Sequence, residues 1–133
     1  MVENRALAYW SMTVLYACMI FYFSSQSTPP EPVASAARGM DLPLHFLEYT
    51  GFSLLLYLSL RESMGHTRYT LMMLVFGVTL YGGLDELHQG FVPGRTTDLR
   101  DLGADVLASI AVALGAESAY RLGLSDHDKR QRA

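Results

Sequence analysis

The chain has 133 residues, a length typical of one domain, and no linker-like segment divides it. Half of its residues are apolar and 17% are charged, and the mean hydropathy is +0.18. Such values fit either a membrane protein or a soluble one. The formal net charge of -3 argues against a nucleic-acid partner, which would need a basic surface. The single cysteine, Cys18, excludes an internal disulfide.

The first apolar segment is the clearest candidate for a membrane-spanning helix. Residues 6–30 contain no charged residue, and the apolar part at 6–23 approaches the roughly 20 residues that a spanning helix needs. A cleaved signal peptide is the main alternative. The weakly basic start, where Glu3 accompanies Arg5, and the distance to the small residues at 33–36 favour a retained helix.

Three further apolar segments follow at 43–60, 69–91 and 98–120, and each carries ionisable residues near one end. A soluble four-helix bundle would need polar outer faces, which the first and third segments lack. We therefore predict an all-α fold, an integral membrane bundle of four transmembrane helices that forms a single domain over 1–133. The charged tail at 121–133 is expected to be disordered.

The basic residues are unevenly distributed over the two sides of such a bundle. With four spans, both termini and the second connection share one side, and this side holds seven of the ten Lys and Arg residues. The positive-inside rule places that side in the cytoplasm. We therefore expect a multi-pass protein of the cytoplasmic membrane with both termini cytoplasmic. The seven basic residues are Arg5, Arg61, Arg68, Arg121, Lys129, Arg130 and Arg132.

Alternating helix directions bring three polar stripes to the outer face. At the start of the second span, the end of the third and the start of the fourth, polar residues recur at the spacing of one helix face. Because carboxylates are costly in lipid, we expect the stripes to point inward and to form a polar cleft that opens outward. The residues are His45, Glu48 and Tyr49; Asp85, Glu86, His88 and Gln89; Asp98, Asp101 and Asp105; and Arg95 between the last two stripes.

Several interpretations of these residues are open. Asp98 and Asp101 could cap the fourth helix, whereas Asp105 lies too far inside it. Two imidazoles and several carboxylates suit zinc or manganese, although no dedicated metal motif such as HExxH is present and no cofactor is identified. His66 falls in a predicted turn and is expected to be solvated.

Catalysis and recognition are two further interpretations. His45 with Glu48, or His88 with Asp85, could supply a base and its orienting carboxylate. No serine or cysteine nucleophile is expected beside them. Arg95 could instead hold a phosphate or carboxylate bidentately, while the acids meet amines or hydroxyls. The residues alone do not decide whether the protein is an enzyme.

Three segments of the chain each carry distinctive polar residues. They are FYFSSQS at 21–27, HFLEYTGFSLLL at 45–56 and YGGLDELHQGFVPGRTTDLRDLGADVLASIAVALG at 81–115. In the order of its DELHQ step, PGR turn and Asp-rich helix start, the third segment resembles the VanZ-like family of small membrane proteins. The resemblance implies a multi-helix membrane fold. For the member that gives the family its name, it implies low-level resistance to the glycopeptide antibiotic teicoplanin.

The resemblance and the stripes together predict a site for a polar headgroup of a cell-envelope lipid or wall precursor. The alternatives are a non-catalytic envelope protein that limits antibiotic access and a small proton- or cation-coupled carrier. The lipid bilayer is the expected partner, and a homo-oligomer is left open. The expected catalytic residues are His45, Glu48, Asp85, Glu86 and His88. The expected ligand-binding residues are Tyr49, Gln89, Arg95, Asp98, Asp101 and Asp105.

Overall fold

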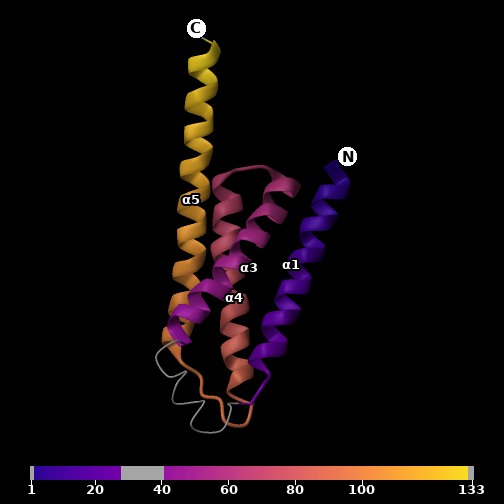
Figure 1. Ribbon diagram of the computed structural model, residues 1–133, viewed down its shortest axis with the longest axis vertical. Coiled ribbons are helices and arrows are strands. Elements are labelled where there is room, and N and C mark those ends of the chain that lie inside the picture. Colours follow the sequence, from indigo (N-terminus) through magenta and orange to yellow (C-terminus); the bar gives the residue numbers. More distant parts are fainter. Residues whose placement is uncertain (1, 28–40, 132–133) are drawn as a thin grey trace.

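The computed structural model describes residues 2–27 and 41–131, which form four α-helices (Figure 1). The helices are α1 (Val2–Ser24), α3 (Asp41–Met64), α4 (Arg68–Gln89) and α5 (Leu99–Gln131). Successive helices run in opposite directions, so the start of α1, the α3–α4 connection and the end of α5 lie toward the same end of the bundle (Figure 1). The prediction of an all-α architecture is confirmed.

Three of the helices are long and apolar enough to cross a membrane. These stretches are Arg5–Ser24 in α1, Arg68–Gln89 in α4 and Leu99–Gly123 in α5. Large apolar side chains cover their outer faces, and Leu15 and Phe76 are each 69% exposed. Water would disfavour so much exposed apolar surface, whereas lipid chains would cover it. The structure therefore indicates a multi-pass membrane protein.

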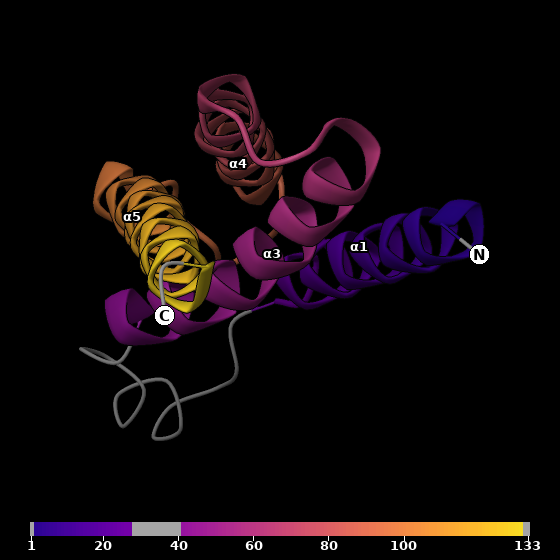
Figure 2. The same ribbon diagram turned by 90° about the horizontal axis from the view of Figure 1, so that it is seen from above.

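Helix α3 lies in the middle of the bundle and packs against the other three helices (Figure 2). It carries polar side chains in fully buried positions, among them Ser53 and Ser59. The Ser59 hydroxyl lies 2.9 Å from that of Thr13 on α1. A helix surrounded by neighbours can carry such groups because they do not face lipid. This central position explains how α3 can lie within the bundle although it is not among the three helices apolar enough to cross a membrane.

Local signals in the sequence explain three of the helix ends. Gly65 follows α3 with a φ of 77°, and its N–H donates to the carbonyl of Arg61 at 2.8 Å. The side chain of Thr67 caps α4 by accepting the N–H of Thr70 at 3.2 Å. Asp98 caps α5 by accepting the N–H of Arg100 at 2.8 Å. The capping prediction for Asp98 is thus confirmed.

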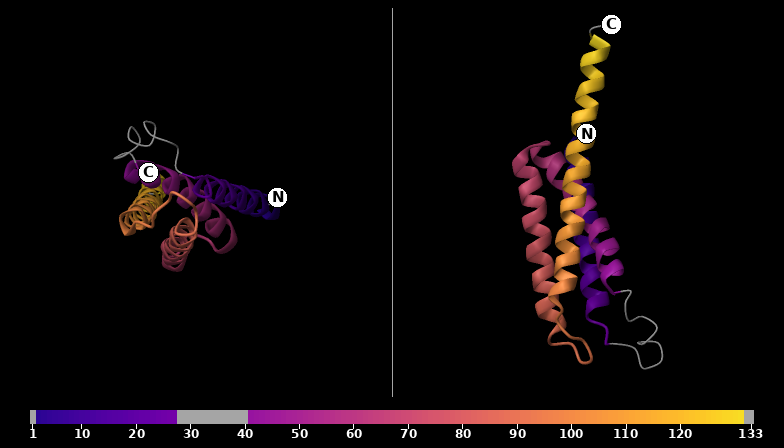
Figure 3. Two further views of the ribbon diagram at one scale, coloured as in Figure 1. Left: turned by 90° about the horizontal axis from the view of Figure 1, so that it is seen from below. Right: turned by 90° about the vertical axis from the view of Figure 1, so that its left-hand side faces the viewer.

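Two helix ends differ from the prediction. Helix α4 ends at Gln89 rather than at residue 91, because the chain turns from Gly90 onward. Helix α5 does not end near residue 120 but continues to Gln131, so that it extends beyond the other helices (Figure 3). The structure describes this tail as helical as far as residue 131, and its expected disorder stays a prediction. Residues 121–131 contain no proline and a single glycine, so no strong helix breaker stops the helix.

Candidate functional site

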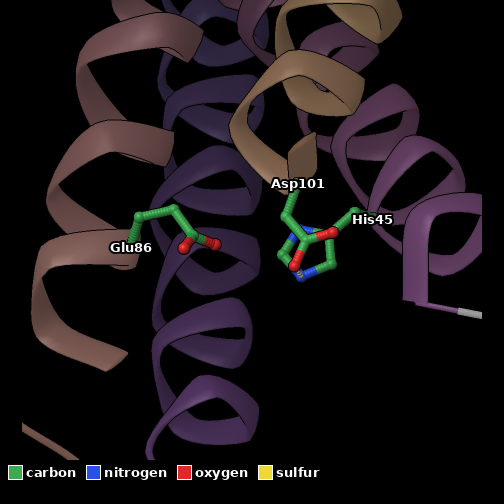
Figure 4. A group of neighbouring side chains, drawn as sticks. All are labelled: His45, Glu86 and Asp101. Atoms are coloured by element: carbon green, nitrogen blue, oxygen red, sulfur yellow. Dashed lines mark ion pairs between the residues drawn. The ribbon is translucent and has the colours of Figure 1, made fainter. Parts of the chain in front are cut away.

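Polar side chains from three helices meet at the end of the bundle where α3 and α5 begin and α4 ends. We call the four residues His45, Glu86, Asp101 and Asp105 the histidine–carboxylate cluster. His45 and Asp101 lie side by side on α3 and α5, and Glu86 points toward them from α4 (Figure 4). One potential metal-ligating atom from each of His45, Glu86 and Asp101 lies within 4.8 Å of the other two. Helices far apart in the sequence thus assemble one site.

Asp105 holds the imidazole of His45 in one orientation. Asp105 Oδ1 lies 3.2 Å from His45 Nδ1. An ionised carboxylate only accepts hydrogen bonds, so Nδ1 donates, and in the neutral imidazole Nε2 then carries the lone pair. Nε2 is directed toward Asp101, whose Oδ2 lies 3.8 Å away. The ring also stacks on Tyr49, with centroids 6.1 Å apart and an interplanar angle of 8°.

Two carboxylate oxygens of the cluster have no hydrogen-bond partner among the described residues. Glu86 Oε2 accepts the main-chain N–H of Asp98 at 2.9 Å, but Oε1 has no donor. Asp105 Oδ1 faces His45, but Oδ2 has no donor. Glu86 and Asp105 are buried, with 6% and 0% exposure. A buried acceptor without a donor costs about 1–3 kcal/mol, so a donor at either oxygen would stabilise the cluster.

Gly82 of α4 makes room for this arrangement. A Cβ atom at this position would lie 2.8 Å from Asp105 Oδ2, 3.2 Å from Leu102 Cδ1 and 3.4 Å from Tyr49 Cε1. Real Cβ atoms do not approach a neighbour as closely as the first of these distances. The packing of α4 against α5 at the cluster therefore requires glycine here.

A second polar group joins the end of α1 to α4. The Ser24 hydroxyl donates to Asp85 Oδ1 at 2.5 Å, and the Gln89 amide donates to Asp85 Oδ2 at 3.1 Å. All three side chains are buried. Both oxygens of Asp85 are therefore satisfied within the protein, unlike those of Glu86 and Asp105.

Ser25 and His88 lie beside this group. His88 Nε2 lies 3.0 Å from the Ser25 hydroxyl oxygen, so a serine stands beside this histidine, which we did not anticipate from the sequence. The Ser25 hydroxyl also donates to the carbonyl of Phe21 at 2.6 Å. Its single proton is thus used, and His88 donates to Ser25. A serine activated as a nucleophile would instead donate to the histidine.

The histidine–carboxylate pairs expected within single helices are not formed. Within the described residues, no hydrogen bond joins His45 to Glu48 or His88 to Asp85. His45 pairs with Asp105, His88 with Ser25 and Asp85 with Ser24 instead. Glu48 is half-buried, and its main-chain carbonyl accepts the hydroxyl of Tyr16 at 3.2 Å. A shared helix face placed these residues near one another without deciding which pairs would form.

Arg95 holds the α4–α5 connection against the end of α1. Its Nε donates to the carbonyl of Gln26 at 3.0 Å, and its Nη2 donates to the carbonyl of Phe23 at 3.2 Å. Both carbonyls lie at the C-terminal end of α1, where positive charge is favourable. The guanidinium therefore has a structural role at this end, and ligand binding by Arg95 stays a prediction.

A further polar cluster at the opposite end was not predicted. His66 lies 2.9 Å from the hydroxyl of Tyr57 through Nδ1 and 3.0 Å from Glu117 Oε2 through Nε2. Arg121 donates to Glu117 Oε1 at 2.6 Å. The side chain of His66 is only 5% exposed, so the expectation that it is solvated is wrong. The reason is that the α3–α4 connection folds over α5, which the local sequence does not reveal.

Comparison of the chain with models of known protein families, with curated proteins and with solved structures finds no match. The class that the fold and site define is a multi-pass helical membrane protein with a buried histidine–carboxylate cluster at one end. The VanZ-like relationship is a prediction that rests on the three sequence segments.

Proposed function

We propose that the protein spans the cytoplasmic membrane four times, with both termini in the cytoplasm. Helix α3 has 24 residues and is therefore about 36 Å long, enough to cross a hydrocarbon core of roughly 30 Å. Its three neighbours would shield its polar side chains from lipid. Arg61, Arg68 and Arg121 lie toward the end of the bundle that this orientation places in the cytoplasm. The histidine–carboxylate cluster then lies near the outer surface.

We further propose that this cluster binds or modifies the polar headgroup of a cell-envelope lipid or wall precursor. The observation that carries the proposal is the pair of buried carboxylates, Glu86 and Asp105, each with an oxygen that lacks a donor. Both carboxylates lie at one end of a bundle whose outer face is apolar. In a membrane, this end would lie at the depth of the lipid headgroups. A ligand with hydroxyl or amino groups would complete the cluster.

The chemistry of the cluster suits a hydroxylated headgroup. Asp105 orients His45 so that Nε2 can accept a proton, which is the arrangement of a general base with its positioning carboxylate. Glu86 and Asp101 supply further acceptors. Arg95 brings a positive charge to the same end of the bundle, where the lipid phosphates lie.

Antibiotic susceptibility tests the link to the cell envelope. A teicoplanin-sensitive Gram-positive host would express the wild type, His45→Gln, Glu86→Gln or the control Glu117→Gln, with membrane levels matched by immunoblot. Glu117 also pairs with a histidine, but at the opposite end. We expect protection by the wild type and the control and its loss in the two cluster variants. Equal protection by all four would exclude the cluster as the working site.

A non-catalytic protein that limits antibiotic access is the second candidate. Its support is that both serine hydroxyls near the site, Ser24 and Ser25, donate to other groups and are not poised for attack. Incubation of the purified protein with a labelled lipid-linked precursor separates the two candidates. A catalyst would convert the precursor, whereas a binder would return it unchanged.

A proton- or cation-coupled carrier is the third candidate, favoured by the complete burial of Asp105 within α5. Proteoliposomes with an imposed pH gradient would test this candidate. Uptake of a labelled solute that depends on the gradient and is lost in Asp105→Asn would support it, and gradient-independent behaviour would remove it.

A further inference from the structure

We propose that His45, Glu86 and Asp101 bind a divalent transition-metal ion. The inference goes beyond the proposed function: with an ion bound, His45 Nε2, Glu86 and Asp101 would hold the metal, and the ion rather than the imidazole would meet the headgroup. One imidazole nitrogen and two carboxylates are a ligand set that zinc and manganese accept. The three side chains come from three helices and face one another across a gap (Figure 4).

The donor atoms lie close to the separation that such an ion requires. Ligands about 2.0–2.2 Å from a tetrahedral zinc ion are about 3.4 Å from one another. The atoms here lie within 4.8 Å of one another, so a contraction of at most about 1.4 Å would close the site, and rotation of the long Glu86 side chain can supply such a shift. Three protein ligands would leave the fourth position for water or a ligand group, as in catalytic zinc sites.

The unpartnered oxygen of Glu86 points independently to a cation. Oε1 belongs to a side chain that is 6% exposed, and it meets no donor among the described residues. No Lys or Arg side chain of the described residues forms an ion pair with Glu86 or Asp105. A buried carboxylate needs a positive partner or a set of donors. A metal ion beside His45 Nε2 would supply that charge.

The contact between Asp105 and His45 is the outer-shell contact that metal-binding histidines show. Asp105 accepts from Nδ1 at 3.2 Å and so fixes the tautomer in which Nε2 offers its lone pair to the gap. Asp105 is thus a positioning residue and not a ligand. Its fully buried place beside Gly82 keeps the imidazole directed toward Asp101 and Glu86.

Zinc binding to the full-length protein tests the proposal. The detergent-purified chain would be stripped with a chelator, titrated with Zn²⁺ alone, desalted and measured for bound metal, with a parallel calorimetric titration. We expect one ion per chain, affinity at least tenfold weaker in His45→Gln, Glu86→Gln and Asp101→Asn, and no change in Glu117→Gln. In Asp105→Asn the affinity should fall by about 10–100-fold, as for other outer-shell changes.

A second measurement needs only the wild type and therefore does not depend on the folding of any variant. Mn²⁺ added to the stripped protein would be examined by pulsed electron paramagnetic resonance for coupling to nitrogen. Coupling to a single imidazole nitrogen supports the proposal. Absence of stoichiometric zinc binding, absence of nitrogen coupling, or equal loss of binding in Glu117→Gln would overturn it. Loss of headgroup binding alone would contradict only the proposed function.

Discussion

Asp105 is the residue on which the packing of the cluster depends. It is fully buried, accepts from His45, and has its second oxygen directed at the position where Gly82 lacks a side chain. A carboxylate is tolerated here because Gly82 of α4 leaves room for it and His45 faces it. Changes at either contact should therefore disturb the cluster before they disturb the fold.

Gly82→Ala tests the close approach of α4 to Asp105. The added Cβ would lie 2.8 Å from Asp105 Oδ2, so we expect a loss of about 1–3 kcal/mol in the free energy of unfolding, as for other overpacked sites. Gly83→Ala is the matched control, because a Cβ there meets nothing within 4 Å. Its expected effect is neutral or slightly stabilising. Reversible unfolding in mixed detergent micelles measures both, and equal stability of the two variants would contradict the prediction.

Ser24→Ala tests the link between α1 and α4. The substitution removes the hydrogen-bond donor to Asp85 Oδ1 and leaves this buried oxygen without that donor. We expect the free energy of unfolding to fall by about 2 kcal/mol. Ser118→Ala serves as the control, since the Ser118 hydroxyl is exposed and bonds only to a carbonyl of its own helix. The same unfolding assay applies. If Ser24→Ala is as stable as Ser118→Ala, the contact with Asp85 contributes nothing measurable.

At the scale of elements, the end of α1 is attached to the rest of the bundle through Arg95, which lies in the α4–α5 connection. Arg95 donates to the carbonyls of Phe23 and Gln26, so Arg95→Gln should release the last turn of α1. Hydrogen–deuterium exchange at residues 21–26 should become faster by about tenfold, which corresponds to the loss of roughly 1.4 kcal/mol of local protection.

Arg100→Gln provides the comparison for this measurement. Arg100 is exposed, and its side chain forms no hydrogen bond within the part of the chain that the structure describes. Exchange at residues 21–26 should be unchanged in this variant. Protection that survives Arg95→Gln would mean that α1 is held by its apolar contacts alone.

The apolar runs predicted the helices well, because the length of a run depends only on the local sequence. Proline, glycine and capping residues explained the ends of α3, α4 and α5. Contacts between helices were less predictable. The sequence placed His45, Asp101 and Asp105 at one end but paired His45 with Glu48, whereas the structure pairs it with Asp105.

The serines and the second cluster were missed for related reasons. Ser24 and Ser25 stand in the FYFSSQS segment that ends α1 at the level of the site, a signal that could have identified them. The burial of His66 offered no such signal, because it depends on the fold of the α3–α4 connection over α5. The continuation of α5 was missed because a run of charged residues was taken to indicate disorder. Most of these residue types have a helix propensity that allows a helix to continue.

At the scale of the whole molecule, several ionisable groups are buried beside an apolar core, while many large apolar side chains are exposed. Buried positions include Asp85, Glu86 and Asp105, while Leu15 and Phe76 are among the most exposed side chains. Buried carboxylates beneath an extensively apolar exterior are unusual for a water-soluble bundle and suit a lipid environment. The membrane, and not water, is therefore the solvent against which the stability of this fold should be judged.

Cysteine labelling in cells tests the proposed topology. In a Cys18→Ser background, Thr96→Cys lies in the α4–α5 connection and Met64→Cys at the end of α3, and both native side chains are exposed. With both termini cytoplasmic, a membrane-impermeant maleimide should label Thr96→Cys in intact cells and Met64→Cys only after permeabilisation. The opposite pattern would invert the orientation, and labelling of both positions in intact cells would contradict α3 or α4 as a span.

The most direct test of the central claim is the affinity of the purified protein in nanodiscs for a labelled lipid-linked wall precursor. The histidine–carboxylate cluster is predicted to form the binding site, so His45→Gln and Glu86→Gln should each weaken binding at least tenfold, or by about 1.4 kcal/mol. Glu117→Gln should bind as the wild type does. Equal affinity in all four proteins, or no binding by the wild type, would contradict a headgroup site at this cluster.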